Sequence, residues 1–311
     1  MPNIKIVHVP HLGGIDAAYQ MPYPFRAEKP TLVLVNAMTT SSELYRPQFD
    51  DAGLTGKMNL IAIEPLGHGQ TRAKSEHFTY WDTAIMNLQV MDALGIQSAF
   101  ALGTSQGGWI VARMALLAPE KVGKIALNCW CAKIQGIIPL GTSMDYESPR
   151  SLAMGNWDGL TQCAARRDAL TTAEPTPEFR LDDSYAKLMM KVGFGNAATP
   201  ELESFWTNEL RVNYAGDDGR RRCRMCWINL GERDGLHGRL RDIKCPVLWL
   251  HGSDDAAFSV RNAEDEIKMF TNAKVAGFMV VPGGAHYLSA SHPKEVGTAV
   301  MEFVDKHFHP E

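Results

Sequence analysis

The stretch Gly103-Thr104-Ser105-Gln106-Gly107 lies between two apolar runs of different character. The run before it, Ser98 to Leu102, is predicted as a strand, and the run after it, Gly108 to Leu117, as a helix. A strand, a tight turn and a helix in this order expose the serine hydroxyl at the carboxyl end of the strand. The two glycines leave room for a strained and closely packed turn. The stretch therefore predicts that Ser105 is a nucleophile.

The composition is that of an ordinary globular protein. The 311 residues are 45% hydrophobic and 21% charged, with a net charge of −4, so neither a nucleic-acid nor a membrane partner is predicted. The first residues do not resemble a secretory signal, and no apolar stretch is long enough to span a bilayer, so we expect a cytoplasmic location. The pair Cys223 and Cys226 lacks a second pair with similar spacing, so we expect reduced structural thiols, no metal and no organic cofactor.

Strand-like and helix-like segments alternate along much of the chain. This alternation predicts an α/β fold with a mostly parallel central sheet and helices on both faces. Helices are expected at 80–94, at 108–117 and near the end, at 294–307. The expected strands are Ile4–Val9, Ala17–Tyr23, Thr31–Val35, Met58–Ile63, Ser98–Leu102, Lys124–Trp130, Pro246–Leu250 and Ala276–Val281.

Residues 132–241 differ from the rest of the chain. They contain no run that we interpret as a buried strand, but they hold helix-like pieces at 184–192 and 201–212. A segment of this length is too long for a loop. We therefore expect a helical cap at 132–241, inserted after the sixth strand into a core made of residues 1–131 and 242–311.

Serine is a weak nucleophile until a base accepts its proton and a third group orients that base. In an open α/β sheet these partners are expected just after other strands, at the same edge. Asp254 and Asp255 follow one predicted strand, and His286 follows the last. Of the ten histidines, only His286 combines this placement with the chain order serine, acid, histidine.

Together these stretches resemble the α/β-hydrolase superfamily, in particular its capped serine esterases and lactonases. The resemblance is carried by the elbow around Ser105 and by further motifs on both sides of the expected cap: Leu32-Val33-Leu34-Val35-Asn36-Ala37-Met38, Glu64-Pro65-Leu66-Gly67-His68-Gly69, Leu94-Gly95-Ile96, His251-Gly252-Ser253-Asp254-Asp255 and Gly284-Ala285-His286.

The resemblance implies a role for each site residue. Ser105 would be the nucleophile, His286 the base and Asp255 the acid, because Asp255 occupies the fourth position of Gly-x-x-Asp; Asp254 is the alternative acid. The backbone N–H groups of Met38 and Gln106 would form the oxyanion hole, although Ala37 stands where the family usually has glycine.

The expected substrate is a small to medium, largely apolar carboxylic ester or lactone. Trp130, Met154, Trp157 and Tyr287 are candidate pocket residues, with Met38 and Gln106 beside the reacting groups. An acyltransferase or lactone-forming cyclase is the main alternative, followed by a C–C hydrolase, a lyase, a cofactor-free haloperoxidase or a non-catalytic ligand receptor. The sequence is compatible with a homo-oligomer.

Overall fold

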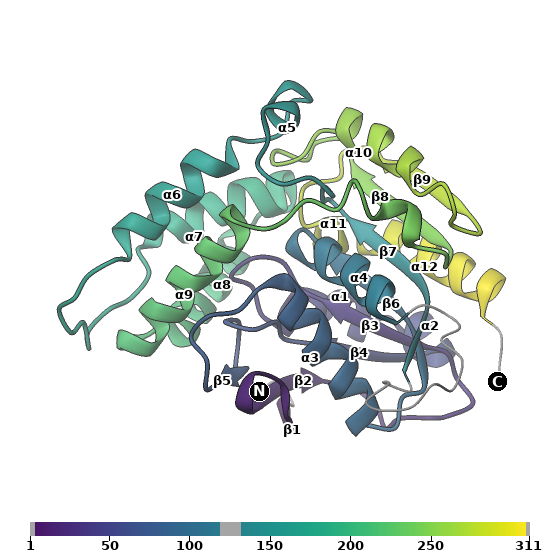
Figure 1. Ribbon diagram of the computed structural model, residues 1–311, viewed down its shortest axis with the longest axis horizontal. Coiled ribbons are helices and arrows are strands. Elements are labelled where there is room, and N and C mark those ends of the chain that lie inside the picture. The colour runs from purple at the N-terminus through teal and green to yellow at the C-terminus, as the bar shows by residue number, and fades with distance from the viewer. Residues whose placement is uncertain (1–3, 119–131, 309–311) are drawn as a thin grey trace.

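The computed structural model describes residues 4–118 and 132–308, which form a twisted sheet covered by helices (Figure 1). The strand order is β1-β2-β4-β3-β6-β7-β8-β9, with the short β5 paired to β2. The strands from β4 to β9 in this order are parallel, whereas β1 and β2 add an antiparallel edge. The strands are β1 (Ile4–Val9), β2 (Ile15–Gln20), β3 (Thr31–Val35), β4 (Asn59–Ile63), β5 (Arg72–Ala73), β6 (Ser98–Thr104), β7 (Lys133–Leu140), β8 (Val247–Gly252) and β9 (Ala276–Val281).

The predicted α/β fold and most of its predicted strands are confirmed. Because side chains alternate across a strand, Val33 and Val35 pack on one face of the sheet and Leu32 and Leu34 on the other. Both faces are covered, which explains why β3 is apolar throughout. The first face carries α3 (Tyr80–Ala93), α4 (Gln106–Leu117) and α10 (Val260–Glu266); the second carries α1 (Arg46–Phe49), α2 (Ala52–Lys57), α11 (Leu288–Ser291) and α12 (Pro293–His307).

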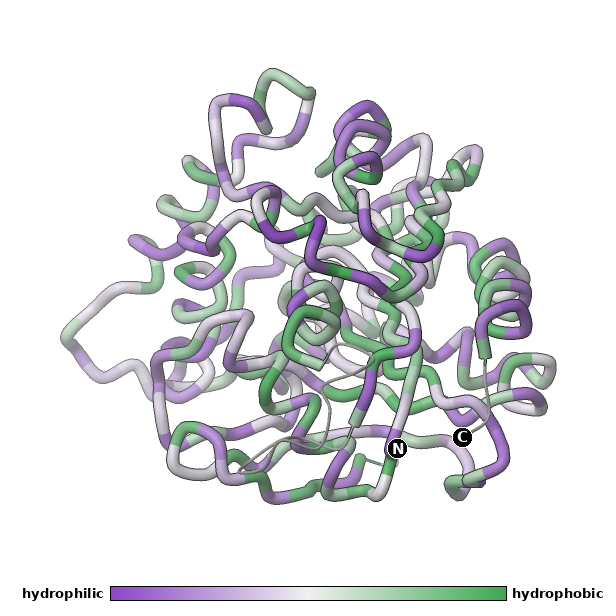
Figure 2. The backbone as a smooth tube through the Cα atoms, turned by 45° about the vertical axis from the view of Figure 1, so that its right-hand side comes forward, coloured by the Kyte–Doolittle hydropathy of each residue, from purple (hydrophilic) through white to green (hydrophobic). Residues whose placement is uncertain are grey.

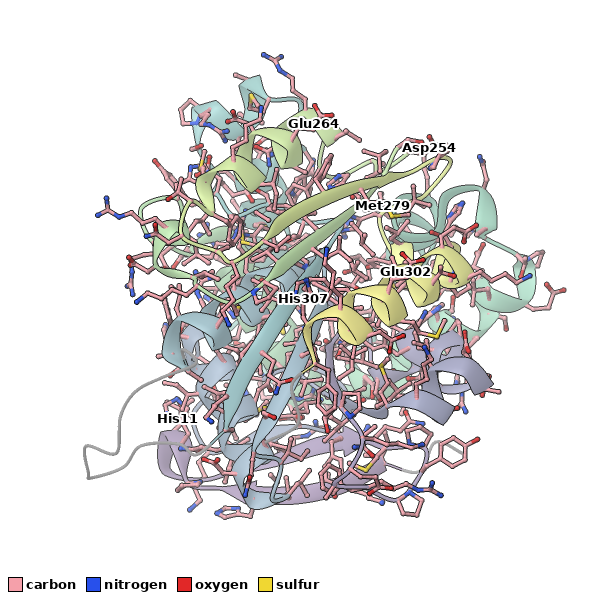
Figure 3. All side chains as sticks on the ribbon, turned by 90° about the vertical axis from the view of Figure 1, so that its right-hand side faces the viewer. His11, Asp254, Glu264, Met279, Glu302 and His307 are labelled. Atoms are coloured by element: carbon pink, nitrogen blue, oxygen red, sulfur yellow. The ribbon has the colours of Figure 1, made fainter. Side chains whose placement is uncertain are left out.

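The pattern of hydropathy follows this layering. Hydrophobic stretches run through the central strands, whereas the outer helices alternate between hydrophobic and hydrophilic positions (Figure 2). On α12, Val296, Val300 and Phe303 are buried against the sheet, while Glu302 points outward (Figure 3). Within residues 4–118 and 132–308, no helix has both the length and the apolar character that a membrane crossing requires.

The boundary expected at residue 132 was wrong, because β7 is a central strand of the sheet. It pairs in parallel with β6 from Ser98–Lys133 to Thr104–Leu140 and also with β8. Gly136 and Pro139 interrupt its apolar pattern and hid it in the sequence. The glycine relieves crowding, because the rings of Phe100 and Phe303 would lie only 3.0 Å from a Cβ at this position. The strand expected at Lys124–Trp130 lies outside the described residues.

Between β7 and β8 the chain forms five α-helices, here called the cap helices. They are α5 (Pro149–Ala153), α6 (Gly159–Ala169), α7 (Asp183–Met189), α8 (Pro200–Asn213) and α9 (Gly216–Gly231). The last four gather at one side of the sheet (Figure 1). Their connection to the core includes a buried ion pair of 2.6 Å between Arg233 and Glu147, with the guanidinium 3.9 Å from the ring centre of Trp109.

Candidate active site

The candidate site lies at the carboxyl edge of the parallel strands. Ser105 follows β6, Asp255 follows β8 and His286 follows β9. The loop after β3, residues 36–42, reaches the same edge and is here called the β3 loop. Residues far apart in the chain meet here because parallel strands bring their carboxyl ends to one side of a sheet.

The turn at Ser105 has the strained geometry that its glycines predict. Ser105 has φ 55° and ψ −117°, a backbone conformation that residues other than glycine rarely adopt. A Cβ at Gly103 would lie 2.1 Å from the backbone of Gly107, and a Cβ at Gly107 would lie 2.1 Å from the carbonyl oxygen of Val35. The turn therefore packs directly on β3. Its position is also fixed by a 2.9 Å hydrogen bond from the Ser105 N–H to the Leu140 carbonyl.

Three of the predicted site residues form a continuous hydrogen-bonded chain. The Ser105 Oγ lies 2.9 Å from His286 Nε2, and His286 Nδ1 lies 3.0 Å from both oxygens of Asp255. Because a carboxylate only accepts hydrogen bonds, Nδ1 carries the proton and Nε2 is free to accept one from the serine hydroxyl. The hydrogen bond to Asp255 thus favours the imidazole tautomer that leaves Nε2 facing the serine hydroxyl.

The carboxylate that bonds to His286 belongs to Asp255, while Asp254 is exposed and accepts a hydrogen bond from Ser253 (Figure 3). The Asp255 side chain is 1% exposed and also accepts hydrogen bonds from the backbone N–H groups of Ala257 and Phe258. Burial opposes its charged form, but the electrostatic attraction and hydrogen bond of His286, with smaller contributions from His251 and the Phe258 N–H, keep the pKa of Asp255 below its usual value. Asp255 therefore stays a carboxylate next to the imidazole.

The β3 loop brings Met38 into the wall of the cavity that Ser105 also lines. The Ala37 carbonyl accepts hydrogen bonds from the Thr40 N–H (3.2 Å), the Thr40 hydroxyl (2.8 Å) and the Asn36 amide (3.3 Å). A trans peptide directs its N–H opposite to its C=O, so these bonds also set the direction of the Met38 N–H. The buried carboxylate of Glu64 holds the far end of the loop through the Ser42 N–H and hydroxyl, each at 3.0 Å.

The Gln106 N–H opens helix α4, where backbone donors have no partner inside the helix. Its side chain points away from the site into a buried network. Gln106 Nε2 lies 2.9 Å from His68 Nε2, and His68 Nδ1 lies 2.9 Å from the Leu66 carbonyl. Burial lowers the pKa of His68 to about 4, so its ring is neutral and accepts from Gln106. His68 thus has a structural role: it links the Gln106 side chain to the turn at Leu66.

A cavity of about 320 Å³ opens in front of Ser105 and His286. Its walls come from the β3 loop, the cap helices and the loops after β8 and β9, and they are mainly apolar and aromatic. The larger lining side chains are Met38, Trp157, Tyr185, Leu188, Met189, Trp227, Leu230, Phe258 and Tyr287. The size and lining are those of a site for a small organic molecule.

Sequence reasoning identified part of this lining. Trp157, Tyr287 and Met38 line the cavity, whereas Met154 and the Gln106 side chain do not; Trp130 lies outside the described residues. Tyr185 and Met189 were missed, although they stand four residues apart on a predicted helix and so share one face. Their apolar spacing equally fits a helix packed in the cap's own core, so the sequence alone does not select them.

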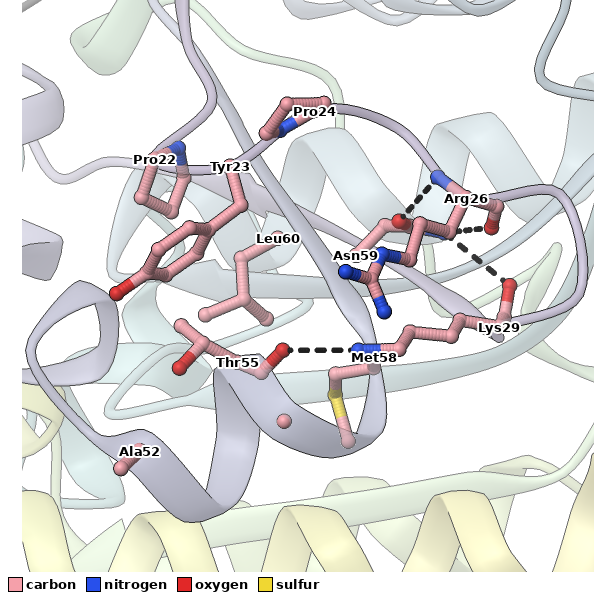
Figure 4. A pocket seen from close by; sticks show the side chains of 11 residues that line it. Pro22, Tyr23, Pro24, Arg26, Lys29, Ala52, Thr55, Met58, Asn59 and Leu60 are labelled. Atoms are coloured by element: carbon pink, nitrogen blue, oxygen red, sulfur yellow. Dashed lines mark hydrogen bonds between the residues drawn. The ribbon is translucent and has the colours of Figure 1, made fainter.

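A second cavity, of about 430 Å³, lies at the opposite edge, where β3 and β4 begin (Figure 4). Among the described residues that line it there is no histidine, aspartate or glutamate, so it offers no nucleophile and base pair. Three side chains lie close enough together to hold a metal ion: Asp145, His237 and Glu266. Their carboxylates already form ion pairs with Arg150 and accept hydrogen bonds from hydroxyl and backbone donors. Cys223 and Cys226 are buried free thiols.

Comparisons with known proteins agree with the fold. The model of the family described as the alpha/beta hydrolase fold matches residues 30–293. A curated relative, (E)-2-((N-methylformamido)methylene)succinate hydrolase of Acinetobacter baylyi, is 22% identical over 284 residues, which cover 90% of this chain and 92% of that protein.

Solved structures superpose over nearly the whole chain. A thermophilic esterase from Thermogutta terrifontis has a TM-score of 0.74 at 16% identity, covering 98% of this chain and all of that one. The enol-lactonase from Burkholderia xenovorans has a TM-score of 0.65 at 17% identity, covering 96% of this chain and all of that one. At such low identity these similarities show the fold alone.

Proposed function

Because the chain belongs to the α/β-hydrolase fold family, we propose that it is a serine hydrolase of carboxylic esters or lactones. The observation that carries the proposal is the chain of hydrogen bonds from Ser105 through His286 to Asp255. It joins a nucleophile, a base and an orienting carboxylate beside an apolar cavity.

In the proposed reaction, Ser105 Oγ attacks the carbonyl carbon of the substrate and its proton passes to His286 Nε2. The carbonyl oxygen becomes an oxyanion and accepts hydrogen bonds from the N–H groups of Met38 and Gln106. The leaving alcohol departs with the proton from His286, and the acyl group stays on Ser105. Water then attacks the acyl carbonyl, gives a proton to His286, and releases the carboxylic acid as Ser105 regains its proton. Asp255 stabilises the imidazolium in both steps.

The cavity suggests a class of substrate. Its described lining residues include no lysine or arginine, and Asp158 is the one carboxylate among them. A buried charge without a partner is costly, so the cavity favours a neutral, apolar or aromatic acyl group. The Acinetobacter baylyi relative is named for a succinate derivative. The lining here is unsuited to the carboxylates of such a compound.

The proposal is tested with 4-nitrophenyl butyrate and a fluorophosphonate probe. Wild-type protein should hydrolyse the ester and take up the probe on Ser105, as located by mass spectrometry of the peptides. Ser105→Ala should lower kcat by at least about 10⁴-fold, because the nucleophile is lost. Ser204→Ala, which alters an exposed serine on α8, is the matched control. Labelling at another residue, or activity retained by Ser105→Ala, would refute the proposal.

A further inference from the structure

The residue after Met38 in the β3 loop has an unusual backbone conformation. Thr39 has φ 58°, in the left-handed region that β-branched residues avoid, and it is 2% exposed. Such a conformation persists only where surrounding contacts impose it, and it is concentrated at functional sites. The contacts of Thr39 therefore show what holds the loop in place.

The Thr39 hydroxyl joins two hydrogen bonds in series. Its Oγ1 lies 2.7 Å from the Met38 carbonyl oxygen and 2.7 Å from the hydroxyl of Tyr185, which comes from α7 of the cap helices. A hydroxyl has a single proton, and a carbonyl only accepts. Thr39 must therefore donate to Met38 and accept from Tyr185, so the series runs from Tyr185 through Thr39 to Met38.

The series from Tyr185 holds the peptide on the carboxyl side of Met38, while the bonds to the Ala37 carbonyl hold the peptide on its amino side. Together they fix both peptide planes that flank Met38. Burial raises the pKa of Tyr185 well above its usual value, so the phenol keeps its proton and remains a donor. Both hydroxyls are buried, where hydrogen bonds are strong because water does not compete.

We propose that Tyr185 is a positioning residue: through Thr39 it holds the Met38 N–H at the angle that the oxyanion requires, so that the cap helices complete the oxyanion hole. This inference rests on the proposed function. It also gives the cap helices a part in catalysis besides lining the cavity, since their position determines whether the donor is aligned.

Two further contacts support a link between the cap helices and this edge of the core. The Ser41 hydroxyl donates to Glu209 of α8 at 2.8 Å, and the Tyr287 N–H donates to the Gly193 carbonyl at 2.6 Å. The first contact lies in the β3 loop and the second next to His286. The cap segment from α7 to α8 is thus tied to both sides of Ser105.

The test separates alignment of the donor from binding of the substrate. Tyr185→Phe keeps the ring in the cavity wall and removes the hydroxyl. We expect kcat for 4-nitrophenyl butyrate to fall about 10- to 100-fold, with KM changed less than about twofold, because a displaced donor weakens only the transition state. The inhibition constant of butaneboronic acid, which forms a tetrahedral anion on serine, should rise by the same factor.

A second pair of variants, at Thr39, tests the same hydrogen bonds if Tyr185→Phe does not fold. Thr39→Val should lower kcat as Tyr185→Phe does, whereas Thr39→Ser, which keeps a hydroxyl, should recover it. The double variant should be no worse than either single one, because both break the same series. Tyr214→Phe is the matched control, since it removes a buried cap hydroxyl that takes no part in this series.

The outcomes separate the two proposals. An active wild-type protein whose Tyr185→Phe and Thr39→Val variants keep full kcat, or change KM alone, would overturn the inference and leave the proposed function standing. Additive losses in the double variant would also overturn it. A wild-type protein that neither hydrolyses the ester nor labels at Ser105 would refute the proposed function and the inference with it.

Discussion

At the scale of the residue, the turn at Ser105 shows why Gly103 and Gly107 were informative in the sequence. Gly107 lies so close to β3 that a Cβ would meet the Val35 carbonyl oxygen at 2.1 Å, an atom of the rigid sheet that cannot move aside. The requirement is local, so it is visible in a five-residue pattern. The proposed acid and base were equally visible, because each directly follows an apolar strand.

We predict that Gly107→Ala lowers the free energy of unfolding by about 3 kcal/mol or more, because the clash forces the turn away from β3. Urea unfolding followed by circular dichroism measures this. Gly56→Ala is the matched control: Gly56 lies in α2 with no atom within 4 Å of its would-be Cβ, so alanine should raise stability by about 0.5–1 kcal/mol. Equal effects of the two substitutions would contradict the packing argument.

At the scale of the element, the strands with unbroken apolar runs could be predicted and β7 could not. β3 and β9 begin and end at the predicted residues. β3 is buried on both faces and has the simple apolar signature of such a strand, whereas β9 lies at the edge of the sheet. In β7, Gly136 makes room for two phenylalanine rings that come from β6 and α12. The reason for that glycine lies in distant parts of the chain, which no local pattern records.

The contact between His237 and α10 should make stability depend on pH. His237 Nε2 lies 2.7 Å from Glu266, and Asp145 and Arg150 complete the cluster. Burial opposes protonation of His237, but the hydrogen bond and charge of Glu266 outweigh it and raise the pKa of His237 above 6.5. A raised folded-state pKa stabilises the fold fully below about pH 6.5, and this contribution is lost as pH rises through the folded-state value.

We therefore predict that His237→Gln lowers the free energy of unfolding by about 2 kcal/mol at pH 5.5 and by clearly less at pH 9. Urea unfolding of both proteins at the two pH values gives the difference directly. A loss that is the same at both pH values, or larger at pH 9, would show that the imidazolium does not stabilise this contact.

At the scale of the whole molecule, the cavity depends on how the cap helices meet the core. Trp157 was predicted as an aromatic residue of the expected cap and Tyr287 as the neighbour of His286, but Tyr185 and Trp227 line the cavity only because α7 and α9 are placed over the sheet edge. Long-range packing of this kind leaves only an apolar face in the sequence. The reacting groups were therefore predictable from the chain, whereas the shape and charge of the substrate site required the structure.

The charge of the cavity leads to a prediction about selectivity. The kcat/KM for 4-nitrophenyl butyrate should exceed that for mono-4-nitrophenyl succinate at least about 100-fold, because the succinyl carboxylate would be buried without a cation among the described lining residues. The methyl ester of the same succinate controls for length and should be hydrolysed nearly as well as the butyrate. Gln162→Arg, which places a cation on the cavity wall, should narrow the ratio about tenfold, whereas Gln162→Met should leave it unchanged. Equal rates for the charged and neutral esters in the wild-type protein would mean that the acyl group does not occupy this cavity.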